Sequence, residues 1–340
     1  MATQNIAIPT GENASILAML ANHIFENHNK EMGDAIINKN FVLAYLKSKA
    51  ESVEVGGLDF AEPVLQAANT NMAYRNKYSQ IDANQQDPTR EFRFDPITLS
   101  GTTVINRVHE LMNMGKSQIR KLAMTYKQQA ESTASNLING ATWATAPVAN
   151  IEPESVISLI STTPTTGTIG GITRSGNVYA QNKLNSATIS SIGSVAGVAA
   201  LHTFWAKLGS TANDTPDFAV TTATLWGNLL GYIDSLRRLR SDEEMTKLSI
   251  PNFYLNTALL GYDGDAGLAT DGVTLGCPAN RLYFLNSKHL FYKVLEGGNM
   301  VFEPFSKKDN SLNSTSIFYH VYNMTTNLPS SMGVLSAITG

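Results

Sequence analysis

The chain has 340 residues, of which 43% are hydrophobic and 16% are charged, and it carries a formal net charge of −3 with a pI near 6.1. A single hydrophobic core rarely grows beyond about 250–300 residues, so this length predicts two substantial lobes. The near-neutral charge balance excludes the strongly basic signature of a dedicated nucleic-acid-binding domain.

The single cysteine, Cys277, excludes an intrachain disulfide framework and any cysteine-based zinc or iron–sulfur site. It is expected to be a small buried residue of a chain made in a reducing compartment. The first residues lack the basic and apolar regions of a signal peptide, and no run of about 18 apolar residues exists. These patterns predict a soluble or shell-forming chain with no membrane span.

The N-terminal part predicts two amphipathic helices, over residues 14–32 and 34–49, followed by a break at Gly56-Gly57 and a strand within 58–69. Residues 72–98 then predict a long, exposed two-stranded hairpin. Residues 72–81 and 90–98 both alternate, with Phe92 and Phe94 on one face and Glu91, Arg93 and Asp95 on the other. An isolated hairpin is marginally stable in water, so it should rest on another surface such as a neighbouring subunit.

The longest predicted helix runs from about Val108 to Asn139-Gly140, because apolar residues repeat there at three- and four-residue steps without a proline. A helix of roughly 30 residues is far longer than average and suggests a spine rather than a small core element. Beyond a Gly/Thr-rich connection at 161–185 we expect helices at 187–208 and 223–240, with strands around 218–222, 280–286, 291–295 and 300–305. The segment 314–324 alternates, which predicts a further strand.

Several segments of the sequence could be read as catalytic or binding sites, but each has a simpler structural explanation. The segment 167–176 is rich in glycine but lacks the P-loop ending, so a turn is favoured over a phosphate site. Asp263, Asp265 and Asp271 resemble a calcium loop, but Thr274 stands where the bidentate glutamate is needed, which favours a solvated turn. The histidines show no metal-binding or catalytic spacing, and no nucleophile elbow occurs. We therefore expect no catalytic residue, no cofactor and no metal.

Basic side chains cluster in two places. Those of the hairpin alternate with aromatic residues and could stack single-stranded bases, but cross-strand pairs and salt bridges to a neighbouring subunit are favoured, because no further basic groove follows. The candidate intersubunit residues there are Arg75, Lys77, Arg90, Glu91 and Arg93. Those of the long helix are most simply a solvated face, with diffuse contact to DNA phosphates as the second interpretation; they are Lys116, Arg120, Lys121 and Lys127.

The order of these segments resembles the major capsid protein of a tailed bacteriophage with the Hong Kong 97-like fold. Residues 41–78 are similar to that family's N-terminal arm, first platform strand and extended loop, and 92–138 to its returning strand and spine helix. Residues 165–185, with the sequence Gly-Gly-Ile-x-Arg, resemble its crossover segment, and 216–230 with 275–294 its axial-domain core. Each motif is weak alone, but the ordered set spans nearly the whole chain.

The resemblance implies an α+β subunit divided into an N-terminal arm (1–50), a peripheral domain (51–71, 99–185 with the spine helix, and C-terminal strands at 316–340), an extended loop (72–98) and an axial domain (186–315). Its implied function is not enzymatic. Subunits would form hexamers and pentamers of an icosahedral shell that encloses double-stranded DNA, and the mature location would be the virion after synthesis in the host bacterial cytoplasm.

The implied partners are further copies of the chain, a separate scaffold protein, a portal protein at one vertex and the packaged DNA, while a cement protein is left open. Lys77 lies in the loop where some family members form a covalent cross-link, but no matched acceptor asparagine is found. Two alternatives stay open. One is an encapsulin-like nanocompartment that stores a cargo enzyme, and the other is a soluble enzyme with an unrecognised site, which the absence of a convergent acid–base or metal set disfavours.

Overall fold

The structure of the protein, a computed structural model, describes residues 40–49, 51–54, 56–81, 84–112, 116–212, 214–233, 253–264, 276–307 and 313–339. The expected helix at 14–32 lies outside these residues, as does the chain beyond Ile233 in the expected helix at 223–240. Of the expected helix at 34–49, the described part forms α2 (Phe41–Lys49), which buries Phe41, Val42, Leu43 and Leu46. No helix in the described ranges is both long and apolar enough to cross a membrane.

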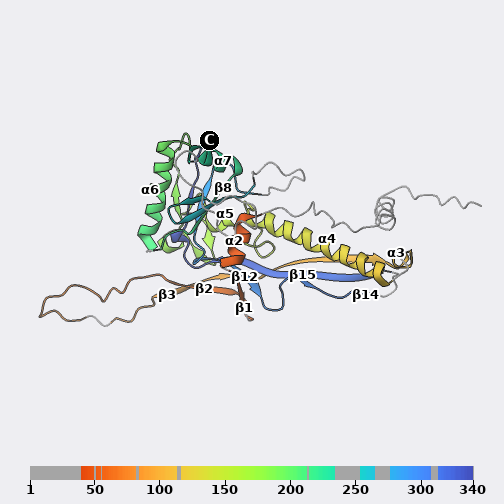
Figure 1. Ribbon diagram of the computed structural model, residues 1–340. Coiled ribbons are helices and arrows are strands. Elements are labelled where there is room, and N and C mark those ends of the chain that lie inside the picture. Colours follow the sequence, from red (N-terminus) through yellow and green to blue (C-terminus); the bar gives the residue numbers. More distant parts are fainter. Residues whose placement is uncertain are drawn as a thin grey trace, which may run out of the picture.

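The first of two large sheets, here called the platform sheet, is built around one long strand (Figure 1). This strand is β15 (Asn313–Thr326), and it pairs with β4 (Ile97–Asn106) on one side. On its other side follow β12 (Leu290–Leu295), β13 (Val301–Phe302) and β14 (Ser306–Lys307), and β12 also pairs with β1 (Glu51–Glu54). The predicted alternation in 314–324 is confirmed, since Phe318, His320 and Tyr322 are buried on one face.

The second sheet, here called the axial sheet, has the strand order β7-β16-β11-β8-β10-β9. Its strands are β7 (Lys183–Asn185), β8 (Phe218–Thr221), β9 (Phe253–Leu255), β10 (Ala258–Tyr262), β11 (Leu282–Leu285) and β16 (Gly333–Leu335). Phe218 and Val220 contribute to one apolar cluster and Ala219 to the other, so β8 is buried on both faces. Helices α6 (Val195–Ala212) and α7 (Ala223–Ile233) cover the second cluster.

The sheets do not follow the expected division at residue 315. Strands β12, β13 and β14 lie within the expected axial segment 186–315 but pair in the platform sheet, whereas β16 lies within 316–340 and joins the axial sheet. The chain thus crosses between the sheets after β11 and again after β15. Sheet membership depends on pairing between strands distant in sequence, which local periodicity does not encode.

The long predicted helix is confirmed, with two differences at its ends. Helix α3 (Arg107–Met112) precedes α4 (Lys116–Thr142), and the three residues between them lie outside the described part. Helix α4 has 27 residues and spans about 40 Å along the platform sheet (Figure 1). It continues past the expected stop at Asn139-Gly140 to Thr142, because Ile138 and Trp143 are buried in the core and the Thr142 hydroxyl donates to the Ile138 carbonyl at 2.9 Å. Tertiary packing outweighs the low helix propensity of Gly140.

The expected hairpin is present, but its strand pairing differs from the prediction. Strand β3 (Thr89–Phe94) pairs with β2 (Phe60–Leu65) and not with residues 72–81, which form no strand in their described conformation. The connection from β2 to β3 extends away from both sheets, and its described residues, 66–81 and 84–88, are here called the distal loop (Figure 1). The alternation in 90–95 is confirmed, because Phe92 and Phe94 are buried while Glu91, Arg93 and Asp95 are exposed.

Candidate assembly interface

The base of the hairpin packs on the Gly/Thr-rich segment of the same chain. The sequence had suggested a neighbouring subunit as an example of a supporting surface. Strands β5 (Thr168–Ile169) and β6 (Ile172–Thr173) form a tight turn at Gly170-Gly171, both with positive φ, which confirms the expected turn. The Arg93 backbone N–H donates to the Gly170 carbonyl at 3.0 Å. A Cβ atom on Gly170 would lie 2.7 Å from the Cβ of Phe92, so only glycine permits this approach.

A buried ion pair fixes the hairpin base to the platform sheet. The Lys293 Nζ of β12 lies 2.8 Å from the Glu62 Oε1 of β2, and both side chains are less than one-tenth exposed. The Thr325 hydroxyl of β15 donates to the same carboxylate at 2.6 Å. Buried charges are tolerated only when they are paired and hydrogen-bonded, and here both conditions are met. This contact joins three strands and sets the direction in which the distal loop leaves the body.

The distal loop is held extended by contacts within itself. The Gln86 side chain donates to Thr70 Oγ1 at 2.6 Å, and Asn71 Nδ2 donates to the Asn84 carbonyl at 2.7 Å. Its large apolar side chains, however, have almost no cover from the described parts of the chain. The side chains exposed by 70% or more at the hairpin are Leu58, Leu65, Met72, Tyr74, Tyr78 and Ile81. Exposed apolar side chains concentrated in this way are typical of interaction sites.

The five predicted intersubunit residues all lie on the hairpin and occupy two parts of it. Arg90, Glu91 and Arg93 are exposed on β3, where the Arg93 guanidinium lies 3.2 Å from Glu91 Oε2 and 3.6 Å from Asp59 Oδ2. Arg75 and Lys77 lie in the distal loop. Arg75 donates to the carbonyls of Asn71 and Gln80, and the Lys77 ammonium lies 4.9 Å from the centre of the Tyr78 ring. Their contacts with a second subunit stay a prediction.

Of the four basic residues expected on the long helix, one is described at side-chain level. Lys127 is exposed, lies 3.5 Å from Glu131 Oε1 one turn later, and is 6.0 Å from the centre of the Phe302 ring. The side chains of Lys116, Arg120 and Lys121 lie outside the described part, so the orientation of this face is untested. The Glu131 pairing fits the solvated-face interpretation for Lys127.

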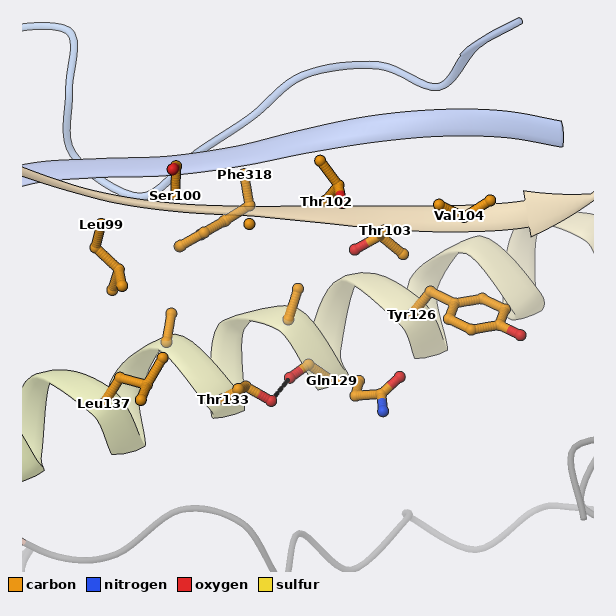
Figure 2. A pocket seen from close by; sticks show the side chains of 13 residues that line it. Leu99, Ser100, Thr102, Thr103, Val104, Tyr126, Gln129, Thr133, Leu137 and Phe318 are labelled. Atoms are coloured by element: carbon orange, nitrogen blue, oxygen red, sulfur yellow. Dashed lines mark hydrogen bonds between the residues drawn. The ribbon is translucent and has the colours of Figure 1, made fainter. Parts of the chain in front are cut away.

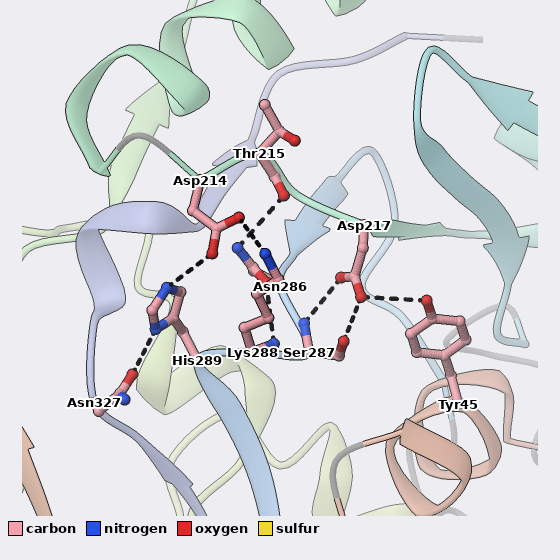
Figure 3. Close-up of polar contacts among 9 residues, drawn as sticks. All are labelled: Tyr45, Asp214, Thr215, Asp217, Asn286, Ser287, Lys288, His289 and Asn327. Atoms are coloured by element: carbon pink, nitrogen blue, oxygen red, sulfur yellow. Dashed lines mark hydrogen bonds and ion pairs between the residues drawn. The ribbon is translucent and has the colours of Figure 1, made fainter.

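Polar side chains gather where the axial sheet meets the platform sheet, but their arrangement does not form a catalytic site (Figure 3). Asp217 accepts hydrogen bonds from the Tyr45 hydroxyl at 3.2 Å and from the Ser287 N–H at 2.9 Å and hydroxyl. The His289 ring contacts Asn327 Oδ1 at 2.7 Å and Asp214 Oδ2 at 3.3 Å. Because the ring does not contact the Ser287 hydroxyl, the cluster lacks the paired nucleophile and base of acyl-transfer enzymes.

The remaining candidate residues for chemistry are packed into the core. Burial lowers the pKa of His320 to about 4, and the ring packs beside Tyr292 and Tyr322, with its Nε2 2.7 Å from the Tyr292 hydroxyl. Cys277 is buried, as expected. Among the described residues no cluster of acidic, histidine and cysteine side chains could hold a metal ion. Asp265 and Asp271 lie outside the described part.

Asp263 differs from the solvated residue that the sequence suggested. It is buried at the end of β10 and accepts a hydrogen bond from the Trp143 indole N–H at 2.7 Å. Burial raises the pKa of this carboxyl to about 7, although hydrogen bonds from Trp143 and from the Phe41 backbone act in the opposite direction. The carboxyl therefore joins the end of α4 to the start of α2.

This raised pKa predicts a pH-dependent stability. The unfolded chain releases the Asp263 proton near its ordinary pKa of 3.8, whereas the folded chain retains it until about pH 7. The free energy of unfolding should therefore fall as pH rises through this window, by up to about 4 kcal/mol. We expect Asp263→Asn to match the native chain at pH 4 and to exceed its stability at pH 8, as measured by denaturant unfolding. Asp87→Asn, an exposed position, controls for the lost charge, and an identical pH response in both variants would contradict the assignment.

One buried charged residue near the hairpin base was not predicted from the sequence. Arg174, the arginine of the Gly-Gly-Ile-x-Arg segment, is almost fully buried. Its guanidinium donates to Asn182 Oδ1 at 3.0 Å and to the carbonyls of Ser158 at 2.6 Å and Leu159 at 3.0 Å. Burial lowers the pKa of Arg174, and the negative charge of Glu154 acts in the opposite direction. Arg174 holds the crossover segment, and with it the Gly170 turn, beneath the hairpin.

Of the comparisons with known proteins, only the comparison with solved structures gives matches. No protein-family model matches the sequence, and no curated protein matches it either. Among solved structures, the capsid asymmetric unit of cyanophage A-1(L) matches with a TM-score of 0.66 and 14% identity, covering 97% of this chain and 99% of that chain. The capsid of Myoviridae phage XM1 matches with a TM-score of 0.57 and 10% identity over 93% and 97% of the two chains.

A third structure, the capsid of a native GTA particle, matches with a TM-score of 0.55 and 11% identity over 97% of this chain and 100% of that chain. At such low identity the likeness establishes the fold. The fold is that of phage capsid proteins, an α+β arrangement of platform sheet, spine helix, extended hairpin and axial sheet. The chain thus has the Hong Kong 97-like fold that the segment order suggested.

Proposed function

We propose that the chain is the major capsid protein of a tailed bacteriophage, and that it self-assembles into hexamers and pentamers of an icosahedral shell around a double-stranded DNA genome. The observation that carries the proposal is the distal loop, which projects from the body with exposed apolar side chains at Met72, Tyr74, Tyr78 and Ile81. A loop of this length without secondary structure is uncommon unless it is functional. In a shell it lies on a neighbouring subunit.

The role in this proposal is mechanical and not enzymatic. Each subunit contributes the hairpin, the platform sheet and the axial sheet to separate contacts, so that many repeated interfaces together stabilise the shell. The fixed hairpin base supports this, because the Lys293–Glu62 ion pair and the Gly170 contact give the loop a defined direction. A preformed direction reduces the conformational entropy lost on assembly.

We propose that the chain also has assembly partners other than its own copies. They are a scaffold protein during assembly in the bacterial cytoplasm, a portal protein at one vertex, and packaged DNA in the virion. Contact between the DNA and the basic face of α4, at Lys116, Arg120, Lys121 and Lys127, would be independent of sequence and weakened by salt.

An encapsulin-like nanocompartment is the alternative with the same fold. It has less support, because the three structures described above are capsids of phages and of a GTA particle. The two functions differ in what the particle encloses. Nucleic acid that copurifies with assembled particles supports the phage capsid, and a copurifying enzyme supports the nanocompartment.

Reversal of one charge at the hairpin base tests the proposed contacts. Arg93→Glu places a third negative charge beside Asp59 and Glu91, and it should lower particle yield by about tenfold or more through repulsion at the interface. The conservative Arg93→Lys should assemble normally, and both variants should match the native chain in unfolding free energy. Yield is measured by sedimentation of particles after coexpression with the scaffold gene, and a normal yield from Arg93→Glu would remove Arg93 from the interface.

A further inference from the structure

The platform sheet, as far as the chain is described, ends in a long strand, β4, that pairs on one side alone. Strand β4 pairs with β15 through all ten of its residues, from Ile97 opposite Tyr322 to Asn106 opposite Asn313. On its other side β4 has no strand partner among the described residues. Every second residue of an antiparallel edge strand directs its N–H and C=O groups outward, so this edge presents a row of backbone groups that pair with no strand in the described part of the chain.

This edge carries none of the usual protection against pairing. Natural proteins block long edge strands with charged side chains, proline, bulges or short length. Strand β4 has the sequence ITLSGTTVIN, which contains no charged residue and no proline. Its second half, Thr102 to Ile105, consists of β-branched residues that favour strand pairing. An unprotected edge of this length is a template for another strand.

A groove beside the same strand offers room for side chains. A cavity of about 320 Å³ lies between β4 and α4 (Figure 2). From the sheet, Leu99, Thr103 and Phe318 line it, and from the helix Tyr126, Thr133 and Leu137 do so. Leu137 is 53% exposed and Val104 is 47% exposed, which is unusual for apolar residues between a helix and a sheet. The lining is neutral, so it suits apolar side chains of an extended segment.

We propose that an extended segment of a second copy of this chain pairs with the outer edge of β4, and that its alternate side chains enter the groove against α4. The inference rests on the proposed function, in which copies of the chain surround one another. The chain also supplies suitable segments, since Met72 and Tyr74 are two residues apart and both are largely exposed. Backbone hydrogen bonds would provide affinity and the groove would select the side chains.

Hydrogen exchange of assembled particles tests this inference directly. We expect alternate amides within 97–106 to exchange at least about tenfold more slowly in particles than in unassembled subunits, because pairing protects the outward-directed groups. Residues 168–173, which pair with each other in β5 and β6 outside the platform sheet, provide an internal reference. Particles that form with unchanged exchange in β4 would overturn the strand addition while leaving the proposed capsid function intact. A chain that never self-associates would contradict both.

A charge placed on the edge strand gives an independent test. Thr102 is exposed on β4, and Thr102→Lys adds the residue type that natural edge strands use to prevent pairing. We expect Thr102→Lys to keep the unfolding free energy of the native chain and to lower the particle yield by about tenfold or more. The matched control is Thr173→Lys on β6, an exposed threonine outside the platform sheet, which should assemble normally. Normal assembly of Thr102→Lys, with β4 amides that exchange as fast in its particles as in unassembled subunits, would contradict pairing at this edge.

Discussion

Replacing Lys293 with methionine is expected to lower the free energy of unfolding by about 3–5 kcal/mol, because it leaves the Glu62 carboxylate buried without its cation. The carboxylate would retain the hydrogen bond from the Thr325 hydroxyl but no neighbouring positive charge from Lys293. It would then have to take up a proton or draw the hairpin base away from the sheet. Denaturant unfolding measures the loss, and particle yield measures its effect on the direction of the distal loop.

Two further variants separate the buried pair from surface electrostatics. Lys288→Met removes a lysine that lies 3.0 Å from Asp214 but is 71% exposed, so the loss should stay below about 1 kcal/mol. The double variant Glu62→Gln with Lys293→Met removes both charges while retaining an acceptor for Thr325, and it should recover most of the stability. If Lys293→Met were no more harmful than Lys288→Met, the buried pair would not anchor the hairpin.

Arg174→Met should be comparably destabilising, by about 3–5 kcal/mol, for a different reason. The substitution keeps part of the apolar stem but leaves the Ser158 and Leu159 carbonyls without the guanidinium that bonds them. Each buried polar group left unpaired costs about 1–3 kcal/mol. The loosened segment would also release the Gly170 turn from β3, so local hydrogen exchange in 168–173 should accelerate.

The matched control for Arg174 is Arg90→Met, at an exposed position of the hairpin. Its unfolding free energy should remain within about 0.5 kcal/mol of the native value. An Arg174→Met protein as stable as Arg90→Met would mean that water replaces the guanidinium, and the crossover segment would then depend on other contacts.

Local patterns in the sequence predicted elements whose periodicity reflects burial. The alternation around Phe92 and Phe94 identified β3, and the apolar repeat after Val108 identified α4. In each of these elements one face is more exposed than the other, which produces the periodic pattern. The same reasoning failed for 72–81, where Tyr74 and Tyr78 are both exposed and no strand forms. Aromatic residues that are exposed in the single chain can produce the same sequence pattern as residues buried in a sheet.

Two of the buried charged residues, Glu62 and Arg174, differ in how far the sequence predicts their burial. Glu62 lies in the alternating stretch of β2 on the same face as Phe60 and Val64, and this pattern alone indicates a carboxylate directed into the core. Arg174 stands in a polar segment rich in glycine and threonine, where an arginine is ordinarily exposed. Its carbonyl partners, Ser158 and Leu159, both belong to α5 (Val156–Leu159), and no local pattern brings them to the arginine.

If the proposed function is right, copies of this chain form a closed shell, and the assembly state of the expressed protein tests this. We would coexpress the chain with its scaffold gene and examine it by sedimentation velocity and negative-stain electron microscopy. We expect closed shells, tubes, or free hexamers and pentamers. A folded protein that remains a monomer or dimer at every concentration, with the scaffold present, would contradict it.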